Sequence, residues 1–441
     1  MSALQPAGHR LPARARRFGS AGAAALELIS VGALFLVSAL ALNAWGFNYE
    51  TTGGTVFEKI HPATWAAFAA LALLLLLRRP APLPYLNALV KSSPGLLVYG
   101  IAFAVLFQHI VLVQRMAFTP VIDTFLAPLA LFICLAQAAP AQRGRLALLL
   151  HAAMFANALL GLYESGTGWR LTPFAPTPGG IGFETDWRSS AFLGHPLTNA
   201  MTTGVYALAL AQGGGRALAP LLRPVALLIQ IIAMVAFGGR ASLVILLALL
   251  GLAACLGGYR AASGARVNLV QAGLVIAAIP LAAILLDQAI ASGFFDRLAE
   301  RFVDDKGSAK SRLVLVQLIN QFSWSELLIG PDPDKLGSLQ TLEGVEFGIE
   351  SFWIGFMLAY GLVASGFFFI GLACFCRELL RETGPGAWIV LVFFFAVATT
   401  SVSISAKSLT LAQMTAVLLI ALPRGRETRT GRRGIRQPAH V

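Results

Sequence analysis

Charged residues are scarce in this sequence. Asp, Glu, Lys and Arg together make up 12% of the 441 residues, whereas hydrophobic residues make up 57%. A soluble globular domain carries about twice this charged fraction. Because the mean hydropathy is also high, at +0.74, the composition excludes an ordinary soluble domain and indicates a membrane protein.

Sequence patterns for metal or nucleotide chemistry are missing too. The six histidines are scattered, and no H-E-x-x-H, Walker loop or G-x-G-x-x-G occurs. The four cysteines all lie in apolar segments, so no disulfide framework is available in an external loop. We therefore expect no metal site and no cofactor. The cysteines are Cys134, Cys255, Cys374 and Cys376.

The chain instead consists of apolar runs of about 16–25 residues, the length that a helix needs to cross a hydrocarbon core of about 30 Å. The runs are continuous rather than alternating, which favours helices over a β-barrel. We expect an all-α, polytopic transmembrane bundle of about 12 spans. The predicted spans are 26–46, 62–77, 94–113, 120–138, 146–163, 191–212, 220–237, 241–258, 267–286, 350–373, 386–401 and 408–422, with 350–373 open to interruption at Gly361 and Gly366.

Basic residues define the orientation. With the N-terminus inside, the cytoplasmic segments hold 21 of the 33 lysines and arginines, against three acidic residues (Glu378, Glu382 and Glu427). This is the positive-inside pattern, and it places both termini in the cytoplasm. The predicted organisation is a basic tail at 1–25, a membrane domain at 26–422 and a second basic tail at 423–441. The tails indicate contact with membrane lipids rather than with nucleic acid.

Two predicted periplasmic loops are long, at 164–190 and 287–349, and function is usually placed in such loops. The first leads into a span through Trp187, Arg188 and His195. Arg188 lies where a cation meets lipid phosphates, although a structural Arg that snorkels to the interface fits the same position. His195 either serves the site or bonds a neighbouring helix.

Arg240 lies in a tight external turn, F-G-G-R-A-S, against the positive-inside trend. Because a small polar residue would make the same turn, an Arg here indicates an anion to be bound.

The second long loop shows helical spacing of Phe294, Leu298 and Phe302, which predicts a helix on the membrane surface. Arg312 begins a second amphipathic helix that ends in a turn at 330–333. Glu346 and Glu350 then precede the next span. A carboxylate there acts as a helix cap or as a catalytic group, and the residues alone leave both interpretations open.

Three external arginines near the headgroup plane suit one chemical group in particular. Guanidinium forks bind phosphate oxygens in pairs and stabilise the charge that develops when a pyrophosphate leaves. The pattern predicts a pyrophosphate site formed by Arg188, Arg240 and Arg312.

In their order along the chain, these motifs resemble the O-antigen ligase and Wzy-type polysaccharide polymerase superfamily, over most of 26–422. Members have many spans and a large external loop near the C-terminal third. The matching motifs are Arg188-Ser-Ser-Ala-Phe-Leu-Gly-His195-Pro196, with Leu197 in place of the expected Asn, then Gly239-Arg240-Ala241-Ser242, and Arg312 ahead of Trp324 and Gly330-Pro331.

One motif departs from the family. Ligases and many polymerases place His-Asn where the long loop meets the next span, but this chain has Gly348-Ile349-Glu350-Ser351. The difference weakens a ligase assignment and favours an exopolysaccharide or capsule polymerase with Glu350 as the base.

The resemblance implies an inverting, metal-independent glycosyl transfer at the periplasmic face of a bacterial inner membrane. The implied donor is a glycan on undecaprenyl pyrophosphate, and the acceptor is a second lipid-linked repeat. Flippase, chain-length regulator and export proteins are the expected partners. Arg188, Arg240, Arg312 and Glu350 are the implied catalytic residues, and His195, Trp187, Glu164 and Glu346 are the implied substrate-binding residues.

Three other functions stay open. A ligase would transfer the glycan to lipid A core or to another acceptor. A lipid-linked oligosaccharide flippase would show charges inside its spans and matched halves, whereas this chain has Glu27 and Asp123 near span ends and no internal repeat. A non-enzymatic scaffold of an envelope assembly machine is the third.

Overall fold

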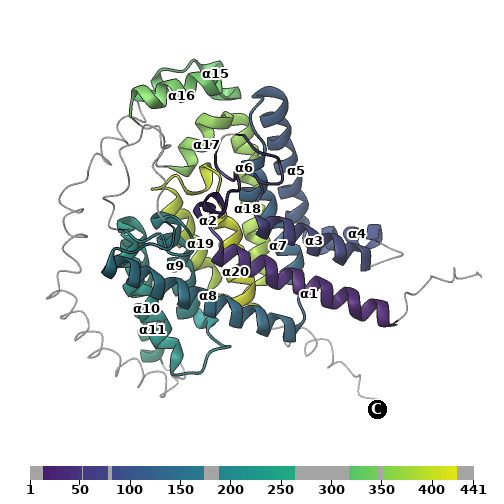
Figure 1. Ribbon diagram of the computed structural model, residues 1–441, viewed down its shortest axis with the longest axis vertical. Coiled ribbons are helices and arrows are strands. Elements are labelled where there is room, and N and C mark those ends of the chain that lie inside the picture. Colours follow the sequence, from purple (N-terminus) through teal and green to yellow (C-terminus); the bar gives the residue numbers. More distant parts are fainter. Residues whose placement is uncertain are drawn as a thin grey trace, which may run out of the picture.

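The computed structural model describes residues 13–51, 53–77, 82–172, 188–263, 317–344, 349 and 351–424. The regular secondary structure of these residues is helical, with turns and loops between the helices and one isolated β-bridge between Thr383 and Pro423. In Figure 1, α8, α10 and α11 gather on one side of the bundle, α5 and α18 on the other, and α20 runs between them. The bounds are α1 (Ala13–Leu36), α2 (Ala39–Ala44), α3 (Pro62–Leu77), α4 (Pro82–Ser92), α5 (Pro94–Gln108), η1 (His109–Val113), α6 (Thr119–Val121), η2 (Ile122–Leu126), α7 (Ala127–Ala136), α8 (Pro140–Thr167), α9 (Pro196–Ala209), η4 (Leu210–Gly214), α10 (Leu222–Phe237), α11 (Arg240–Ala262), α15 (Trp324–Ile329), α16 (Pro333–Leu342), α17 (Phe352–Tyr360), α18 (Leu362–Glu382), α19 (Ala387–Ala398), η5 (Ser403–Ser405) and α20 (Thr410–Ala421).

The predicted apolar segments coincide with helices, except for 267–286, which lies outside the described residues. Four helical stretches of the described chain are long and apolar enough to cross a membrane: Pro94–Val113, Thr119–Ala136, Pro140–Thr167 and Leu362–Glu382. The other apolar helical stretches in the described ranges are shorter, at 10–17 residues, and include Ala21–Leu36 within α1 and Arg240–Cys255 within α11. The helical class is therefore confirmed, and the twelve-span count stays a prediction.

Several helix boundaries differ from the predicted spans. The first span is interrupted at residues 37–38, where the Ser38 side chain accepts a hydrogen bond from the Ala41 amide at 3.1 Å and begins α2. Its first helix, α1, starts well inside the predicted tail, at Ala13, because this segment is rich in Ala and Arg, which favour helix. The 350–373 span is in two pieces, as foreseen, and the break is at Gly361 (φ 79°) rather than at Gly366.

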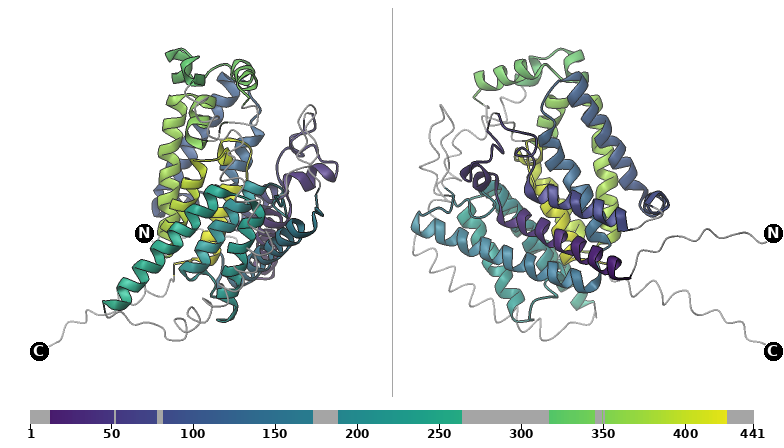
Figure 2. Two further views of the ribbon diagram at one scale, coloured as in Figure 1. Left: turned by 90° about the vertical axis from the view of Figure 1, so that its left-hand side faces the viewer. Right: turned by 45° about the vertical axis from the view of Figure 1, so that its right-hand side comes forward.

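Close helix packing replaces the hydrophobic driving force that lipid cannot supply. The helices α5 and α18 pack against each other extensively and stand side by side in both views of Figure 2. A Cβ atom added to Gly371 would overlap the Cβ atom of Ala102 on α5. Aromatic pairs flank this contact along α18: the tilted rings of Tyr99 and Phe375 have centroids 4.7 Å apart, and Phe125 meets Phe368 edge-on at 4.6 Å.

The end of the bundle predicted to be cytoplasmic is held by polar contacts. The Glu378 carboxylate on α18, which is buried, accepts a hydrogen bond from the Gly95 amide at the start of α5 at 3.2 Å. The guanidinium of Arg381 lies 3.1 Å from the same carboxylate. The carbonyl of Leu422 accepts from the Gly384 amide at 2.7 Å, so the ends of α18 and α20 are joined as well.

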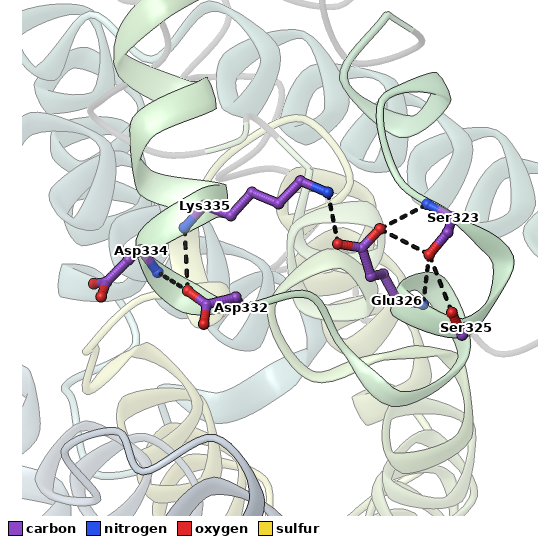
Figure 3. A network of polar contacts seen from close by, with 6 residues as sticks. All are labelled: Ser323, Ser325, Glu326, Asp332, Asp334 and Lys335. Atoms are coloured by element: carbon purple, nitrogen blue, oxygen red, sulfur yellow. Dashed lines mark hydrogen bonds and ion pairs between the residues drawn. The ribbon is translucent and has the colours of Figure 1, made fainter.

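Part of the second long loop, residues 317–344, forms a helical cap across the opposite end of the bundle (Figure 1). The predicted single helix from Arg312 to the 330 turn is wrong in this part: the chain breaks at 321–323, and Ser323 starts α15 with a capping box to Glu326. Asp332 caps α16, and Lys335 on α16 lies 2.6 Å from the Glu326 carboxylate, which ties the two helices together (Figure 3).

We predict that Gly371→Ala destabilises the protein by about 1–3 kcal/mol, because the new methyl group forces α5 and α18 apart. Gly366→Ala is the matched control on the same helix: nothing lies within 4 Å of a Cβ there, so the gain in helix propensity makes it neutral or slightly stabilising. Thermal unfolding in nanodiscs checks both variants. Equal melting temperatures for the two variants would contradict the packing argument.

Candidate functional site

The candidate site is built around the short chain segment 188–195, which connects the first long loop to α9. The buried Glu164 carboxylate, near the end of α8, holds this segment. One of its oxygens accepts hydrogen bonds from the Ser189 hydroxyl at 2.6 Å, the Ser190 amide at 3.1 Å and the Ala191 amide at 2.9 Å. The other accepts from the Leu171 amide at 3.0 Å. Glu164, which the sequence predicted to bind substrate, therefore fixes the position of this loop by accepting hydrogen bonds from its amides.

Further polar contacts, made by two asparagines of α8 and α9, hold the same segment. Asn157 on α8 donates to the Asn199 side chain on α9 at 2.9 Å and accepts from the Phe192 amide at 3.1 Å. Asn199 donates in turn to the His195 carbonyl at 3.1 Å. Both asparagines are buried, so the segment between Arg188 and His195 is held at a defined position.

This segment meets the turn that carries Arg240. The Ser189 amide donates to the Ala236 carbonyl near the end of α10 at 3.0 Å. Gly238 ends α10 in the left-handed region (φ 62°), and Arg240 then begins α11. A Cβ atom on Gly239 would lie 2.5 Å from the Cβ of Ala200, so the turn also packs on α9. The fold therefore brings the main chains next to Arg188 and Arg240 to one end of the bundle.

His195 is the exposed N-cap residue of α9, and its Nδ1 atom accepts a hydrogen bond from the Leu197 amide at 3.2 Å. Arg170, which the sequence analysis did not single out, donates to the Arg188 carbonyl at 2.6 Å. Trp187, Arg312, Glu346 and Glu350 lie outside the described residues, and their roles stay predictions.

A buried polar cluster lies next to this loop, around Asp123, which the sequence predicted only as a charge near a span end and not as part of a site. Asp123, in the π-helical turn η2, is fully buried and accepts from the Tyr49 hydroxyl at 2.7 Å and the Thr64 hydroxyl at 2.6 Å. It also accepts from the His61 amide at 3.1 Å. The His61 Nε2 atom reaches the Val37 carbonyl at 3.1 Å. The next residue, Ser38, contacts the 188–195 segment, because a Cβ on Gly194 would lie 2.5 Å from its Cβ.

Lys407 adds a cation to this cluster. Its ammonium group donates to the carbonyls of Tyr49 at 2.7 Å and Lys59 at 2.8 Å, and lies 3.2 Å from the centre of the Tyr49 ring. Burial lowers the pKa of Lys407 to about 8, although Asp123 and Glu50 act in the opposite direction. Like Arg240, Lys407 is a cation on the side that the charge pattern predicts to be periplasmic, where cations are disfavoured.

The helix α17, which follows Ser351, packs against η5, the turn just before Lys407. Ser351 precedes α17, and a Cβ atom on Gly355 would lie 3.4 Å from the Ser405 hydroxyl in η5, two residues from Lys407. Hence the described neighbours of Glu350 along the chain lie at the Lys407 end of the bundle.

Among the residues that the structure describes, no group of three or more His, Cys, Asp or Glu side chains is arranged to hold a metal ion. Comparisons with protein-family models and with curated protein sequences find no match for this chain.

Glu164→Gln tests the carboxylate as the support of the loop. Because Gln presents an NH₂ group to donors that now face an oxygen, we expect a loss of about 2–3 kcal/mol of stability. Glu343→Gln is the control, since Glu343 accepts from the exposed Gln321 side chain at the surface, and it should change little. Chemical or thermal unfolding measures both. A melting temperature of Glu164→Gln equal to that of the control would contradict the assignment.

His61 predicts a specific acid sensitivity. Burial lowers the pKa of His61 from its ordinary value of 6.5 to about 4, and the charge of Lys407 lowers it further. The folded state therefore holds His61 neutral while the unfolded chain protonates, so the stability present above about pH 6.5 declines as the pH falls towards about 4. Between pH 7.5 and 5 the loss due to His61 is about 2 kcal/mol.

His61→Asn should remove most of this pH dependence, because Asn still caps a helix but does not titrate. The matched control is His195→Asn: His195 also caps a helix through Nδ1 but is exposed, so this variant should keep the acid sensitivity of the parent. The measurement is the melting temperature of each variant and of the parent at pH 7.5 and at pH 5. An undiminished drop in His61→Asn would rule out His61 as the source.

Proposed function

We propose that the chain is a membrane glycosyltransferase that polymerises undecaprenyl-pyrophosphate-linked oligosaccharide repeats at the periplasmic face of a bacterial inner membrane. The observation that carries this proposal is the 3.0 Å hydrogen bond from the Ser189 amide to the Ala236 carbonyl. It joins the loop of Arg188 to the turn of Arg240, which are the two described arginines of the predicted pyrophosphate site.

The support that these arginines receive suits an anion site. A bidentate grip on phosphate needs guanidinium groups held in a fixed relation, because misplacement lowers transition-state stabilisation steeply. Glu164 and Asn157 hold the segment that follows Arg188 through buried hydrogen bonds. Arg240 starts a helix directly after a glycine turn packed on α9.

In the proposed reaction the hydroxyl oxygen of the acceptor sugar attacks the anomeric carbon of the donor, on the face opposite the pyrophosphate. The carbon–oxygen bond to pyrophosphate breaks, and undecaprenyl pyrophosphate leaves with the bonding electrons. Arg188, Arg240 and Arg312 stabilise the leaving negative charge. Glu350 accepts the hydroxyl proton. The product is a longer glycan on one carrier lipid and a free carrier pyrophosphate.

The three arginines should not tolerate lysine. We predict that Arg188→Lys, Arg240→Lys and Arg312→Lys each lower polymer formation by at least about tenfold, because an ammonium group cannot form the paired contacts. Arg216→Lys, an exposed residue in an expected cytoplasmic segment, is the control. Lipid-linked glycans extracted from a complemented deletion strain provide the measurement.

The same assay separates the proposed activity from its alternatives. Deletion of a polymerase leaves single repeats on the carrier lipid, whereas deletion of a ligase leaves finished polymer on it. Loss of a flippase leaves the repeats facing the cytoplasm. Wild-type polymer yield from all three lysine variants, at normal protein levels, would refute the pyrophosphate site.

Glu350 provides the sharpest test of the mechanism. If Glu350 is the general base, Glu350→Gln should lower turnover by roughly 10²–10⁴-fold without loss of folding or donor binding. Glu346→Gln, in the same loop and with the same charge change, is the control. If Glu350 only supports the start of α17, whose N-cap residue is Ser351, Gln is nearly silent and Ala costs at most about 0.5–2 kcal/mol of stability. Full activity of Glu350→Gln would exclude it as the base.

A further inference from the structure

The cap formed by α15 and α16 carries an apolar surface that the proposed reaction does not use. Trp324 and Leu328 lie one turn apart on α15, so they share a face, and both are exposed, Trp324 to 76%. Ile329, at the end of the helix, is 56% exposed. Exposed apolar side chains on a helix that lies across a bundle need a partner in solution or in lipid.

The other faces of α15 are already occupied. Leu327 packs against an apolar cluster of the cap and α17 that includes Phe322, Leu336 and Leu358. Glu326 faces α16 and is bonded to Lys335 and Ser323 (Figure 3). The hydrogen bond from Lys335 lowers the pKa of Glu326 to about 2, so this face of α15 stays charged. The helix thus has an inward apolar face, a charged face and an outward apolar face.

The end of α15 touches the point where a candidate membrane helix begins. A Cβ atom on Gly361 would overlap the Ile329 carbonyl, so Ile329 lies directly at the start of α18. The outward side chains of α18 from this point are Val363, Phe367 and Ile370, all exposed, with Val363 at 65%. The apolar outer surface of α18 therefore continues onto α15.

The neighbouring helix α5, together with η1, ends close to the start of α18. At the end of α5 and η1, Leu112 and Val113 are exposed, and Arg115 follows in the left-handed region at φ 53°. The side chain of Gln114 donates to the Ala359 carbonyl beside the same junction. Two candidate membrane helices thus end at the height of α15, where exposed apolar residues give way to a cation. This is the order of groups found at the lipid headgroup region.

We propose that α15 is an interfacial helix, with Trp324 and Leu328 inserted among the lipids of the outer leaflet while Glu326 and α16 stay on the aqueous side. Trp prefers this depth because its ring is amphipathic. The attachment holds the cap, and with it the entry to α17, at a set height above the bilayer. This inference is independent of the proposed glycosyl transfer.

The test places a nitroxide at single cysteines in the full chain, with the four native cysteines replaced by alanine, in nanodiscs of phosphatidylethanolamine and phosphatidylglycerol. Trp324→Cys and Leu328→Cys report on the outward face. Asp334→Cys and Ser338→Cys, exposed positions of α16, are the matched controls. Collision rates with oxygen, which concentrates in lipid, and with a water-soluble nickel chelate are measured at each position.

We expect the ratio of oxygen to nickel collisions at 324 and 328 to be severalfold higher than at 334 and 338. Equal ratios at all four positions would show that α15 faces water and would overturn the proposal. Low collision rates with both reagents at 324 and 328 would show that protein covers this face, which would overturn it too.

Discussion

Backbone amides in a non-helical segment must find partners when the segment is packed inside an apolar bundle, and one carboxylate meets this need for the candidate site. Glu164 accepts hydrogen bonds from the Ser190, Ala191 and Leu171 amides and from the Ser189 hydroxyl. Without these bonds the turn before α9 would leave several donors unpaired, at a cost of about 1–3 kcal/mol each. The height and direction of the Arg188 segment thus depend on a residue of α8.

Asp123 performs the same task for the opposite side of the site. Its carboxylate accepts hydrogen bonds from the Tyr49 and Thr64 hydroxyls and from the His61 amide, which hold the segment between α2 and α3 against η2. Lys407 then closes the cluster by binding two carbonyls of that segment. The two carboxylates are linked through residues 37 and 38, of which the first bonds His61 and the second contacts Gly194. A change at either carboxylate therefore affects a shared arrangement of loops.

Hydrophobic patterning predicted the helices well because long apolar runs have few alternatives in a membrane protein. The 62–77 segment was predicted to the residue, and Gly361 was recognised as a point of interruption. Breaks made by polar contacts were harder to predict. The Ser38 cap divides the first span, and the Ser323 capping box divides the predicted helix after Arg312. Each is a local hydrogen-bond choice that changes mean hydropathy little.

By itself the sequence determined the helical class and the approximate apolar segments, and it predicted that Arg188 and Arg240 are unusual external cations, because length and charge are properties of single segments. Only the tertiary structure decided that Glu164 supports a loop, that Asp123 and Lys407 belong to one cluster, and that the Arg188 segment lies against the end of α10. These relations join residues tens to hundreds of positions apart. Such pairing depends on which buried donor meets which acceptor once the helices have packed. A pattern along the chain therefore does not predict it.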